Sequence, residues 1–186
     1  MKTFNGFLTE AKKPKGAVFT FGRFNPPTTG HAKLVKQLQK VAKGFDVLLF
    51  TSHSNDRRKN PLTHKQKISY LRKFFGKIVV DSTVRTVFDV ANQLQQQKYT
   101  HVRMVVGSDR IREFETLLNK YNGVKARHGF YKFESIEVVS AGERDPDADD
   151  VSGMSASKLR GYAEQGDFDN FKLGVPSKNA SDIQRL

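Results

Sequence analysis

A ten-residue stretch near the beginning of the chain, residues 22–31, holds the side chains whose types and spacing best suit chemistry. It follows a short apolar run over 17–21 and precedes apolar residues with helical spacing. The pattern predicts a buried strand, a loop bent by glycine and proline, and a helix with His31 at its mouth. Unpaired backbone N–H groups and the positive end of the helix point outward at such a junction. We therefore expect a phosphate-binding site there.

A second stretch of this kind lies near the C-terminal end, at residues 154–160. Ser155 is a good N-cap for a helix, and Ser157 follows it in the first turn. The hydroxyl groups, the N–H groups of the helix start and the guanidinium of Arg160 would then converge on a phosphate. The alternative interpretation is an ordinary capped helix with an exposed arginine.

The turn over 107–110 follows another apolar run and begins with Gly107. Asp109 is placed to meet a ribose hydroxyl and Arg110 to meet a phosphate. A helix cap followed by a solvent-exposed arginine is the alternative.

The loop over 52–61 is rich in polar and basic residues. Three of them would recognise the phosphate of an acceptor molecule, or would simply be solvated: Arg57, Arg58 and Lys59.

The composition bounds these hypotheses. The chain has 186 residues, enough for one domain with a full core, and no cysteine. Disulfides, cysteine-bound zinc and thiol nucleophiles are therefore excluded, which fits an intracellular protein. The patterns HExxH, GxGxxG and GxxxxGK(S/T) do not occur in the sequence, and no EF-hand loop is complete. This argues against a zinc protease, a dehydrogenase, a P-loop kinase and an EF-hand calcium site.

The chain is strongly basic, with a net charge of +13 and a pI near 10.0. Such a balance favours polyanionic partners, namely nucleotides, nucleic acid or acidic surfaces, although a solvated basic surface is the alternative. No run approaches the roughly 20 apolar residues of a membrane span, and no secretory signal is evident. We expect a soluble protein of the cytoplasm.

Hydrophobic patterning predicts alternating strands and helices. The strands are expected at 17–21, 45–51, 77–80, 101–106 and 135–140, and the helices at 31–42, 63–75, 84–97, 109–119 and 155–165. Thr63 and Gln66 form the pattern of a capping box. Five such strands imply a mostly parallel sheet with helices on both faces. With the strand order 3-2-1-4-5, the first and fourth strands end beside each other, so their loops face one another.

The first motif resembles the (H/T)xGH signature of the nucleotidylyltransferase superfamily, the adenylyl- and cytidylyltransferases, whose members carry GxFxPxHxGH or GxFxPxTxGH. Six positions match in register: Gly22, Phe24, Pro26, Thr28, Gly30 and His31. The second motif resembles the ISSTxIR motif of the same superfamily. Four of its positions match or nearly match, at Ser155, Ser157, Leu159 and Arg160, whereas Met154 and Ala156 depart from it.

The resemblance implies a Rossmann-like, doubly wound domain over 16–175 that transfers a nucleotidyl group to a phosphorylated acceptor. It gives catalytic roles to three residues. His31 would contact the α-phosphate, Thr28 would donate a hydrogen bond to a phosphate, and Arg160 would also act on the phosphates. The residues implied in binding the nucleotide and its phosphates are Gly22, Arg23, Phe24, Gly30, Ser155, Ser157, Gly107 and Asp109. Mg²⁺ is expected on the triphosphate, held mainly by phosphate oxygens and water.

Arg23 makes the first motif similar to that of nicotinamide mononucleotide adenylyltransferases, so ATP and nicotinamide mononucleotide are the expected substrates. Cytidylyl transfer and adenylyl transfer to phosphopantetheine are the alternatives among enzymes. A basic, non-catalytic protein that binds nucleotides or nucleic acid is the alternative of another class. A component of a phage head is one version, because residues 8–11 resemble the leader cleavage sites of tailed bacteriophage head proteins. The location would then be the host cytoplasm or the virion head.

The ends of the chain are expected to lie outside the domain. Residues 1–15 are predicted to be a leader or flexible tail and residues 176–186 a C-terminal tail. The sequence is also compatible with an oligomer.

Overall fold

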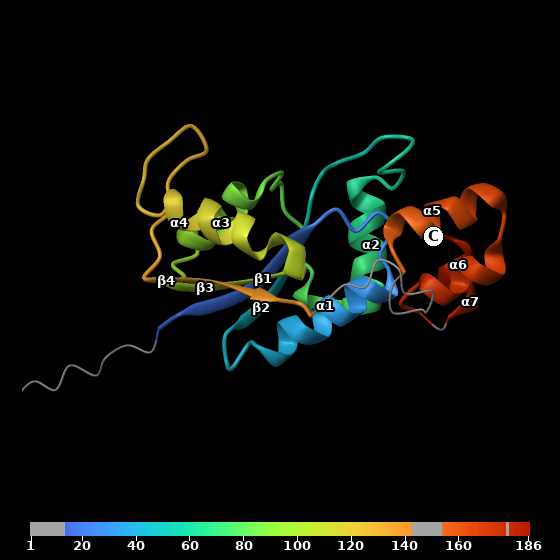
Figure 1. The fold of residues 1–186 in the computed structure, drawn as a ribbon, viewed down its shortest axis with the longest axis horizontal. Helices are drawn as coiled ribbons and strands as arrows, with labels where there is room; N and C mark the ends of the chain where they lie inside the picture. The colour runs from blue at the N-terminus through green and yellow to red at the C-terminus, as the bar shows by residue number, and fades with distance from the viewer. Residues whose placement is uncertain (1–13, 143–153, 178) are drawn as a thin grey trace, which may run out of the picture.

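Four parallel strands form a central sheet in the computed structural model, which describes residues 14–142, 154–177 and 179–186 (Figure 1). The strands are β1 (Gly16–Gly22), β2 (Asp46–Thr51), β3 (His101–Val106) and β4 (Ser135–Ser140), in the spatial order β2-β1-β3-β4. Neighbouring strands all pair in parallel. The predicted Rossmann-like α/β class is confirmed. The expected leader over 1–15 lies almost entirely outside the described residues.

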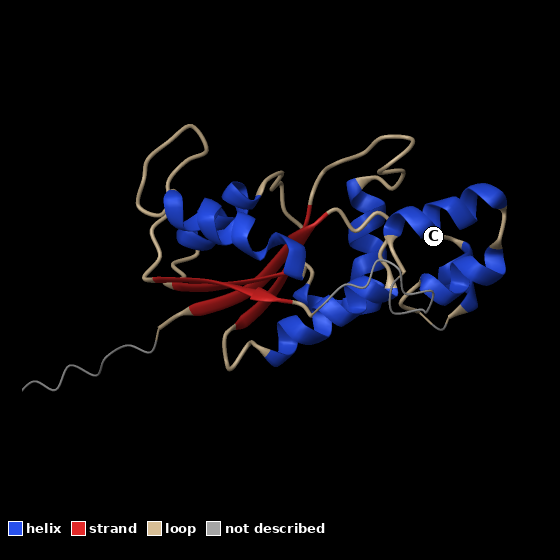
Figure 2. Ribbon diagram, in the orientation of Figure 1, coloured by secondary structure: helices blue, strands red, loops and turns tan. Residues whose placement is uncertain are grey.

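Helices cover both faces of this sheet. They are α1 (Thr29–Lys40), α2 (His64–Phe75), α3 (Val87–Gln96), α4 (Ile111–Lys120), α5 (Ala156–Gln165), α6 (Phe168–Gly174) and α7 (Ala180–Gln184), with short 3₁₀ turns η1 (Gly76–Ile78) and η2 (Ser108–Arg110). Helices α3 and α4 lie on one face and α1 on the other (Figures 1 and 2). All five predicted helices occur, with small shifts at their ends. No helix in the described ranges is long and apolar enough to cross a membrane.

The prediction of five strands was wrong by one. The segment over 77–80 forms only an isolated parallel bridge, between Val79 and Leu49 of β2. The turn η1 precedes it and begins at Gly76, whose φ is 71°. This turn leaves too few extended residues for a strand. Because the bridge lies beside β2, the predicted order 3-2-1-4-5 holds, with its outer strand reduced to one bridge.

Alternate side chains of β1 enter opposite layers of the core. Ala17 and Phe19 are buried in a cluster with α3 and α4, whereas Val18 is buried with Leu38 of α1 and Val105 of β3. Successive side chains of a strand point to opposite faces, so a central strand covered on both sides must be apolar throughout. This requirement explains the unbroken apolar run that precedes the first motif.

Three helices begin with the same reciprocal hydrogen bonds. In each, a threonine N-cap accepts from the backbone of the third helical residue, whose side chain accepts from the backbone of the threonine. The predicted capping box of Thr63 and Gln66 is one of them. Such boxes satisfy N–H groups that a helix start otherwise leaves unpaired. The starts of α1, α2 and α3 are therefore specified by residues close in sequence.

Helices α5, α6 and α7 pack together beside α2 (Figure 1). Ile183 of α7 is buried in an apolar cluster that also includes Phe74 of α2. Lys73 and Asp182 form an ion pair at 2.5 Å. The expected C-terminal tail over 176–186 thus ends in a helix that packs on the fold instead of extending from it.

Candidate active site

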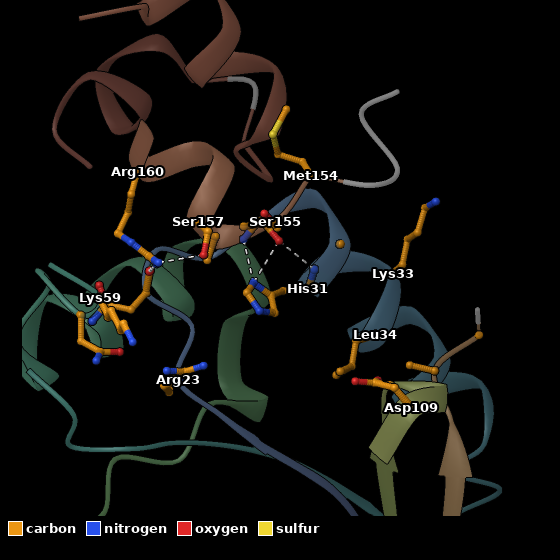
Figure 3. A pocket seen from close by; sticks show the side chains of 18 residues that line it. Arg23, His31, Lys33, Leu34, Lys59, Asp109, Met154, Ser155, Ser157 and Arg160 are labelled. Atoms are coloured by element: carbon orange, nitrogen blue, oxygen red, sulfur yellow. Dashed lines mark hydrogen bonds between the residues drawn. The ribbon is translucent and has the colours of Figure 1, made fainter. Parts of the chain in front are cut away.

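A cleft of about 570 Å³ opens at the carboxyl ends of β1 and β3, where the start of α1, η2 and the start of α5 meet (Figure 3). The described residues that line it come from segments far apart in sequence: Arg23, Asn25, Thr28, Gly30, His31, Lys33, Leu34, Lys59, Asn60, Gly107, Asp109, Ala141, Gly142, Met154, Ser155, Ala156, Ser157 and Arg160. Because β2 and β3 lie on either side of β1, the cleft occupies the switch point of the sheet. The two predicted motifs meet there.

The start of α1 fixes Thr28 and His31 against each other. The Oγ1 of Thr28 accepts a hydrogen bond from the backbone N–H of His31 at 3.2 Å, and the backbone N–H of Thr28 donates to Nδ1 of His31 at 2.9 Å. A backbone N–H is always a donor, so Nδ1 must act as an acceptor. A neutral His31 therefore carries its proton on Nε2. In this form the imidazole is able to donate a hydrogen bond to a phosphate oxygen.

Phe24 and Gly22 support the histidine instead of lining the cleft. Phe24 is 2% exposed, and its ring centroid lies 4.7 Å from that of His31. A Cβ atom on Gly22 would lie 3.0 Å from the Phe24 ring, so glycine leaves room for this packing. In the described structure these two residues position the loop, while Arg23 between them is exposed and lines the cleft. Their contacts with the nucleotide stay a prediction.

The start of α5 supplies a second set of polar groups. Ser155 caps the helix by accepting from the backbone N–H of Lys158 at 3.1 Å. Arg160 Nη2 donates to Oγ of Ser157 at 2.9 Å, and Nη1 donates to the carbonyl of Asn25 at 2.7 Å. The guanidinium thus lies between α5 and the loop that precedes α1 (Figure 3).

The loop between β2 and α2 is tied to the same asparagine. The side chain of Asn25 accepts from the backbone N–H of Leu62 at 2.9 Å and donates to the Leu62 carbonyl at 3.0 Å. This loop places Lys59 and Asn60 in the cleft wall. The Oδ1 of Asn60 is buried without a hydrogen-bond partner in the part of the chain that the structure describes.

Three predicted contacts are not brought to the cleft. Arg57 and Arg58 are exposed in the β2–α2 loop and, in the described structure, do not line it. Arg110 instead donates two hydrogen bonds to the Glu113 carboxylate, at 2.7 and 2.8 Å, and its guanidinium lies over the ring of Phe114. These bonds hold the pKa of Glu113 below its usual range. Among the described residues predicted to bind the acceptor, only Lys59 lines the cleft, and the acceptor role of the three arginines stays a prediction.

The charge of the cleft wall is mainly positive. Arg23, Lys33, Lys59 and Arg160 line it, whereas Asp109 is the single carboxylate among the described lining residues (Figure 3). Basic side chains around a concave site concentrate anionic ligands. The arrangement suits a ligand with several phosphates.

The turn before α4 places Asp109 on the wall formed by β3. A Cβ atom on Gly107 would lie 2.6 Å from Oδ1 of Asp109, so glycine allows the carboxylate to lie close over the turn. Both residues line the cleft, as predicted from their position after the strand.

Three lining residues were not predicted: Asn25, Lys33 and Asn60. Lys33 lies two positions after His31 in α1, and its charge near the helix start is a signal that the sequence contains. The two asparagines carry no such signal, because their roles depend on contacts between loops that are distant in sequence.

Lys67 of α2 is fully buried beneath the β2–α2 loop. Its Nζ donates to the carbonyl of Ser52 and, at 3.3 Å, to that of Ser54; no carboxylate pairs with it in the described structure. Burial disfavours the ammonium form and lowers the pKa of Lys67 to about 8. The amine therefore anchors the beginning of the loop that carries Lys59 and Asn60.

The fold and the cleft together define an α/β protein that binds phosphorylated ligands at the switch point of its sheet. Residues 19–161 match the model of a family described as cytidylyltransferase-like, and the match spans well over half of the chain. The chain belongs to this family and is a nucleotidyltransferase. The comparison with curated proteins finds no match.

A solved structure has a similar fold. It is the nicotinic acid mononucleotide adenylyltransferase of Plasmodium falciparum, complexed with NaAD, with a TM-score of 0.58 and 12% sequence identity. The similarity covers 91% of this chain and 93% of that chain. At this level of identity, the likeness concerns the fold. The predicted resemblance to the nucleotidylyltransferase superfamily is confirmed.

Proposed function

We propose that the protein transfers AMP from ATP to a small phosphorylated acceptor, such as nicotinamide mononucleotide, and releases pyrophosphate. The observation that carries the proposal is the convergence of two helix starts, α1 and α5, on one basic cleft. Each helix start presents N–H groups and the positive end of a helix dipole. Two of them in one cleft suit the combined charge of a triphosphate and an acceptor phosphate.

The reaction needs positioning more than proton transfer. An oxygen of the acceptor phosphate attacks the α-phosphorus, and the bond from that phosphorus to the bridging oxygen of the departing pyrophosphate breaks. The acceptor is already an anion near neutral pH, so no general base is needed. The protein must hold the two anions in line and stabilise the charge on the phosphoryl oxygens.

His31 would stabilise that charge through Nε2–H. The hydrogen bond from Thr28 to Nδ1 holds the imidazole in the tautomer that this donation requires. Gly30 lies in the cleft wall beside them. Without a side chain there, a phosphate is able to approach the backbone of the first turn closely.

The α5 side of the cleft would hold the β- and γ-phosphates. The hydroxyls of Ser155 and Ser157 and the guanidinium of Arg160 all line this side. Arg160 donates to two protein oxygens, at 2.7 and 2.9 Å, which keeps its planar group in place before the nucleotide binds. A guanidinium has further N–H donors for phosphate oxygens.

Mg²⁺ fits the cleft as a companion of the triphosphate. No group of three His, Asp or Glu side chains that could hold a metal occurs among the described residues. Mg²⁺ keeps several waters and commonly binds through phosphates and one or two carboxylates. Asp109 is the lining carboxylate that would reach it. When bound, the ion would neutralise part of the phosphate charge.

The choice of acceptor rests on Arg23 and on the similar structure. Arg23 is exposed at the cleft beside the first strand, where it would meet the phosphate of a mononucleotide. The similar structure is that of a nicotinic acid mononucleotide adenylyltransferase, which also points to a pyridine mononucleotide as acceptor. Cytidylyl transfer and transfer to phosphopantetheine remain the competing reactions.

The test is pyrophosphate release in the presence of Mg²⁺. ATP or CTP would be paired with nicotinamide mononucleotide, nicotinic acid mononucleotide, phosphopantetheine and small sugar or alcohol phosphates, with His31→Ala beside the wild type. We expect turnover with ATP and a pyridine mononucleotide, lost in the variant. Turnover with CTP alone would overturn the choice of nucleotide. Nucleotide binding without turnover for any pair would favour a non-catalytic nucleotide-binding protein.

A further inference from the structure

A surface at the other end of the sheet carries charge that the cleft does not use. Residues 120–132, the basic loop, comprise the last residue of α4 and most of its connection to β4, and lie near the amino ends of the strands on the side of α3 and α4 (Figure 1). Residues 120–132 include no acidic residue and four basic ones: Lys120, Lys125, Arg127 and Lys132. Glu134 follows them, and its exposed carboxylate lies 3.9 Å from the His101 ring. All four basic residues are exposed, and none of them forms an ion pair within the described ranges. Their charge is therefore available to a partner.

The basic loop also exposes apolar side chains. Val124 is 45% exposed and Phe130 is 46% exposed. They are two of the four large apolar residues most exposed to solvent in the part of the chain that the structure describes. An exposed aromatic ring within a run of exposed basic residues distinguishes this loop from an ordinary solvated basic face.

Hydrogen bonds within the loop and to Phe133, which follows it, fix its shape. The side chain of Asn122 donates to the carbonyl of Phe133 at 3.0 Å and accepts from the backbone N–H of Phe133 at 2.8 Å. Ala126 and Gly129 exchange backbone hydrogen bonds at 3.1 and 2.9 Å. Gly129 has a φ of 101°, which only glycine adopts readily. The next residue, Phe130, is thus displayed from a tight, defined turn.

Packing beneath the loop fixes its position on the domain. The ring of His128 stacks on Phe88 of α3, with centroids 4.1 Å apart, and meets Tyr121 edge-on at 4.6 Å. The side chain of Asn92 of α3 donates to the carbonyl of His128 at 2.5 Å. Because the loop is ordered by the protein itself, a partner would bind it without the cost of ordering it.

We propose that the basic loop binds single-stranded nucleic acid. A base would stack on Phe130, and the phosphates on either side would lie near the four cations. Aromatic platforms combined with basic grooves are the usual means of holding single strands without sequence preference. A duplex keeps the faces of its bases stacked within the helix, so the exposed ring favours a single strand. This surface is separate from the cleft, because the two lie at opposite ends of the strands.

The test is fluorescence anisotropy with a labelled oligothymidine of about 20 nucleotides and a duplex of equal length, in the presence of saturating ATP to occupy the cleft. We expect single-strand binding that weakens with salt. Lys125→Gln with Arg127→Gln should lower the slope of log K against log salt by about 1.4, since each phosphate contact contributes about 0.7. Phe130→Ala should weaken binding about tenfold, whereas Phe130→Tyr should retain it.

The controls distinguish binding by the basic loop from binding by positive charge elsewhere on the surface. Lys36→Gln removes an exposed cation on α1, outside the basic loop and the cleft, and should leave binding nearly unchanged. Thermal melts check that each variant is folded. Absence of binding at low salt, equal affinity for the duplex, or equal loss with Lys36→Gln would overturn the proposal. Equally tight binding of a polyglutamate peptide would also overturn it, because the loop would then accept any polyanion.

Discussion

The two helix starts that meet in the cleft are built in different ways. At α1, Thr28 and His31 hold each other through reciprocal hydrogen bonds between residues three positions apart. At α5, Ser155 caps the helix alone, and Arg160 is positioned by the carbonyl of Asn25, which lies 135 positions away. The first proposed phosphate site is therefore a local structure, whereas the second forms only when the whole domain is folded.

The two helix starts divide two tasks differently: capping the helix and contacting a phosphate. In α1, the residue that completes the cap is also the one proposed to touch the α-phosphate. In α5, Ser155 caps the helix, whereas two further proposed phosphate contacts, Ser157 and Arg160, take no part in the cap. Substitutions should therefore uncouple stability from activity in characteristic ways at each start.

The largest effect is expected from His31→Gln. Glutamine at this helix position completes a capping box, so the free energy of unfolding should change little. The imidazole Nε2–H is lost, and removal of one such donor typically lowers kcat by about 10²–10³-fold. Pyrophosphate release and urea unfolding measure the two quantities. Unimpaired turnover in this variant would refute the assigned role of His31, while His31→Ala should lower both turnover and stability.

Lys67, buried beneath the β2–α2 loop, should make the free energy of unfolding depend on pH. This loop contacts Asn25, which lies between the two helix starts. The pKa of Lys67, about 8, lies below the usual value near 10.5, so between these pH values the unfolded chain binds the proton and the native state does not. Stability from this group is therefore gained as pH rises from about 8 to 10.5 and is lost as pH falls. Over this whole pH range the gain in unfolding free energy is about 3 kcal/mol.

Lys67→Met should abolish that gain. We expect the difference in unfolding free energy between wild type and variant to shift in favour of the wild type by about 2 kcal/mol between pH 7 and pH 9.5. Urea unfolding at both pH values measures it. A difference that is the same at both would show that burial of Lys67 does not shift its titration. Lys65→Met, at an exposed position of the same helix, serves as the matched control.

Arg160→Lys should weaken binding of the triphosphate at the start of α5 while keeping a positive charge at position 160. A lysine ammonium does not reproduce the planar fork that contacts Ser157 and Asn25 together. We expect kcat/KM for the triphosphate to fall about tenfold, as for loss of one hydrogen bond to a charged group. Steady-state kinetics provide the measurement, and Arg112→Lys on the exposed side of α4 is the control. Equal kinetics for both variants would contradict the proposed role.

The smallest of the expected effects is at Ser155. Ser155→Ala removes the cap of α5 and should cost about 1 kcal/mol of unfolding free energy. Ser155→Asp keeps a capping oxygen, so stability should be retained, but its carboxylate would repel the triphosphate. Unfolding and nucleotide-binding measurements on the two variants distinguish these effects. Wild-type nucleotide affinity in Ser155→Asp would place the phosphates elsewhere.

The fold was largely predictable from the sequence, because its helices and buried strands have clear periodicity. The one strand that failed, over 77–80, is a short apolar segment, and periodicity does not reveal the turn that shortens it. The charged residues were less predictable. Arg57 and Arg58 lie in the same loop as Lys59, and Arg110 ends the turn η2, yet of these four described residues only Lys59 lines the cleft. The direction of an exposed side chain depends on partners such as Glu113, which the spacing of the motif does not indicate.

The sequence by itself determined the local elements of this protein: the capped start of α1 with His31, the capped start of α5, and the alternation that produces a parallel sheet. These features depend on hydrogen bonds and apolar spacing within a few residues. The tertiary structure decided which groups meet. It brought Asn25 between Leu62 and Arg160, buried Lys67 beneath a loop, and placed the basic loop at the far end of the sheet. Such contacts join segments distant along the chain, so they arise only when the packed core fixes where each loop lies.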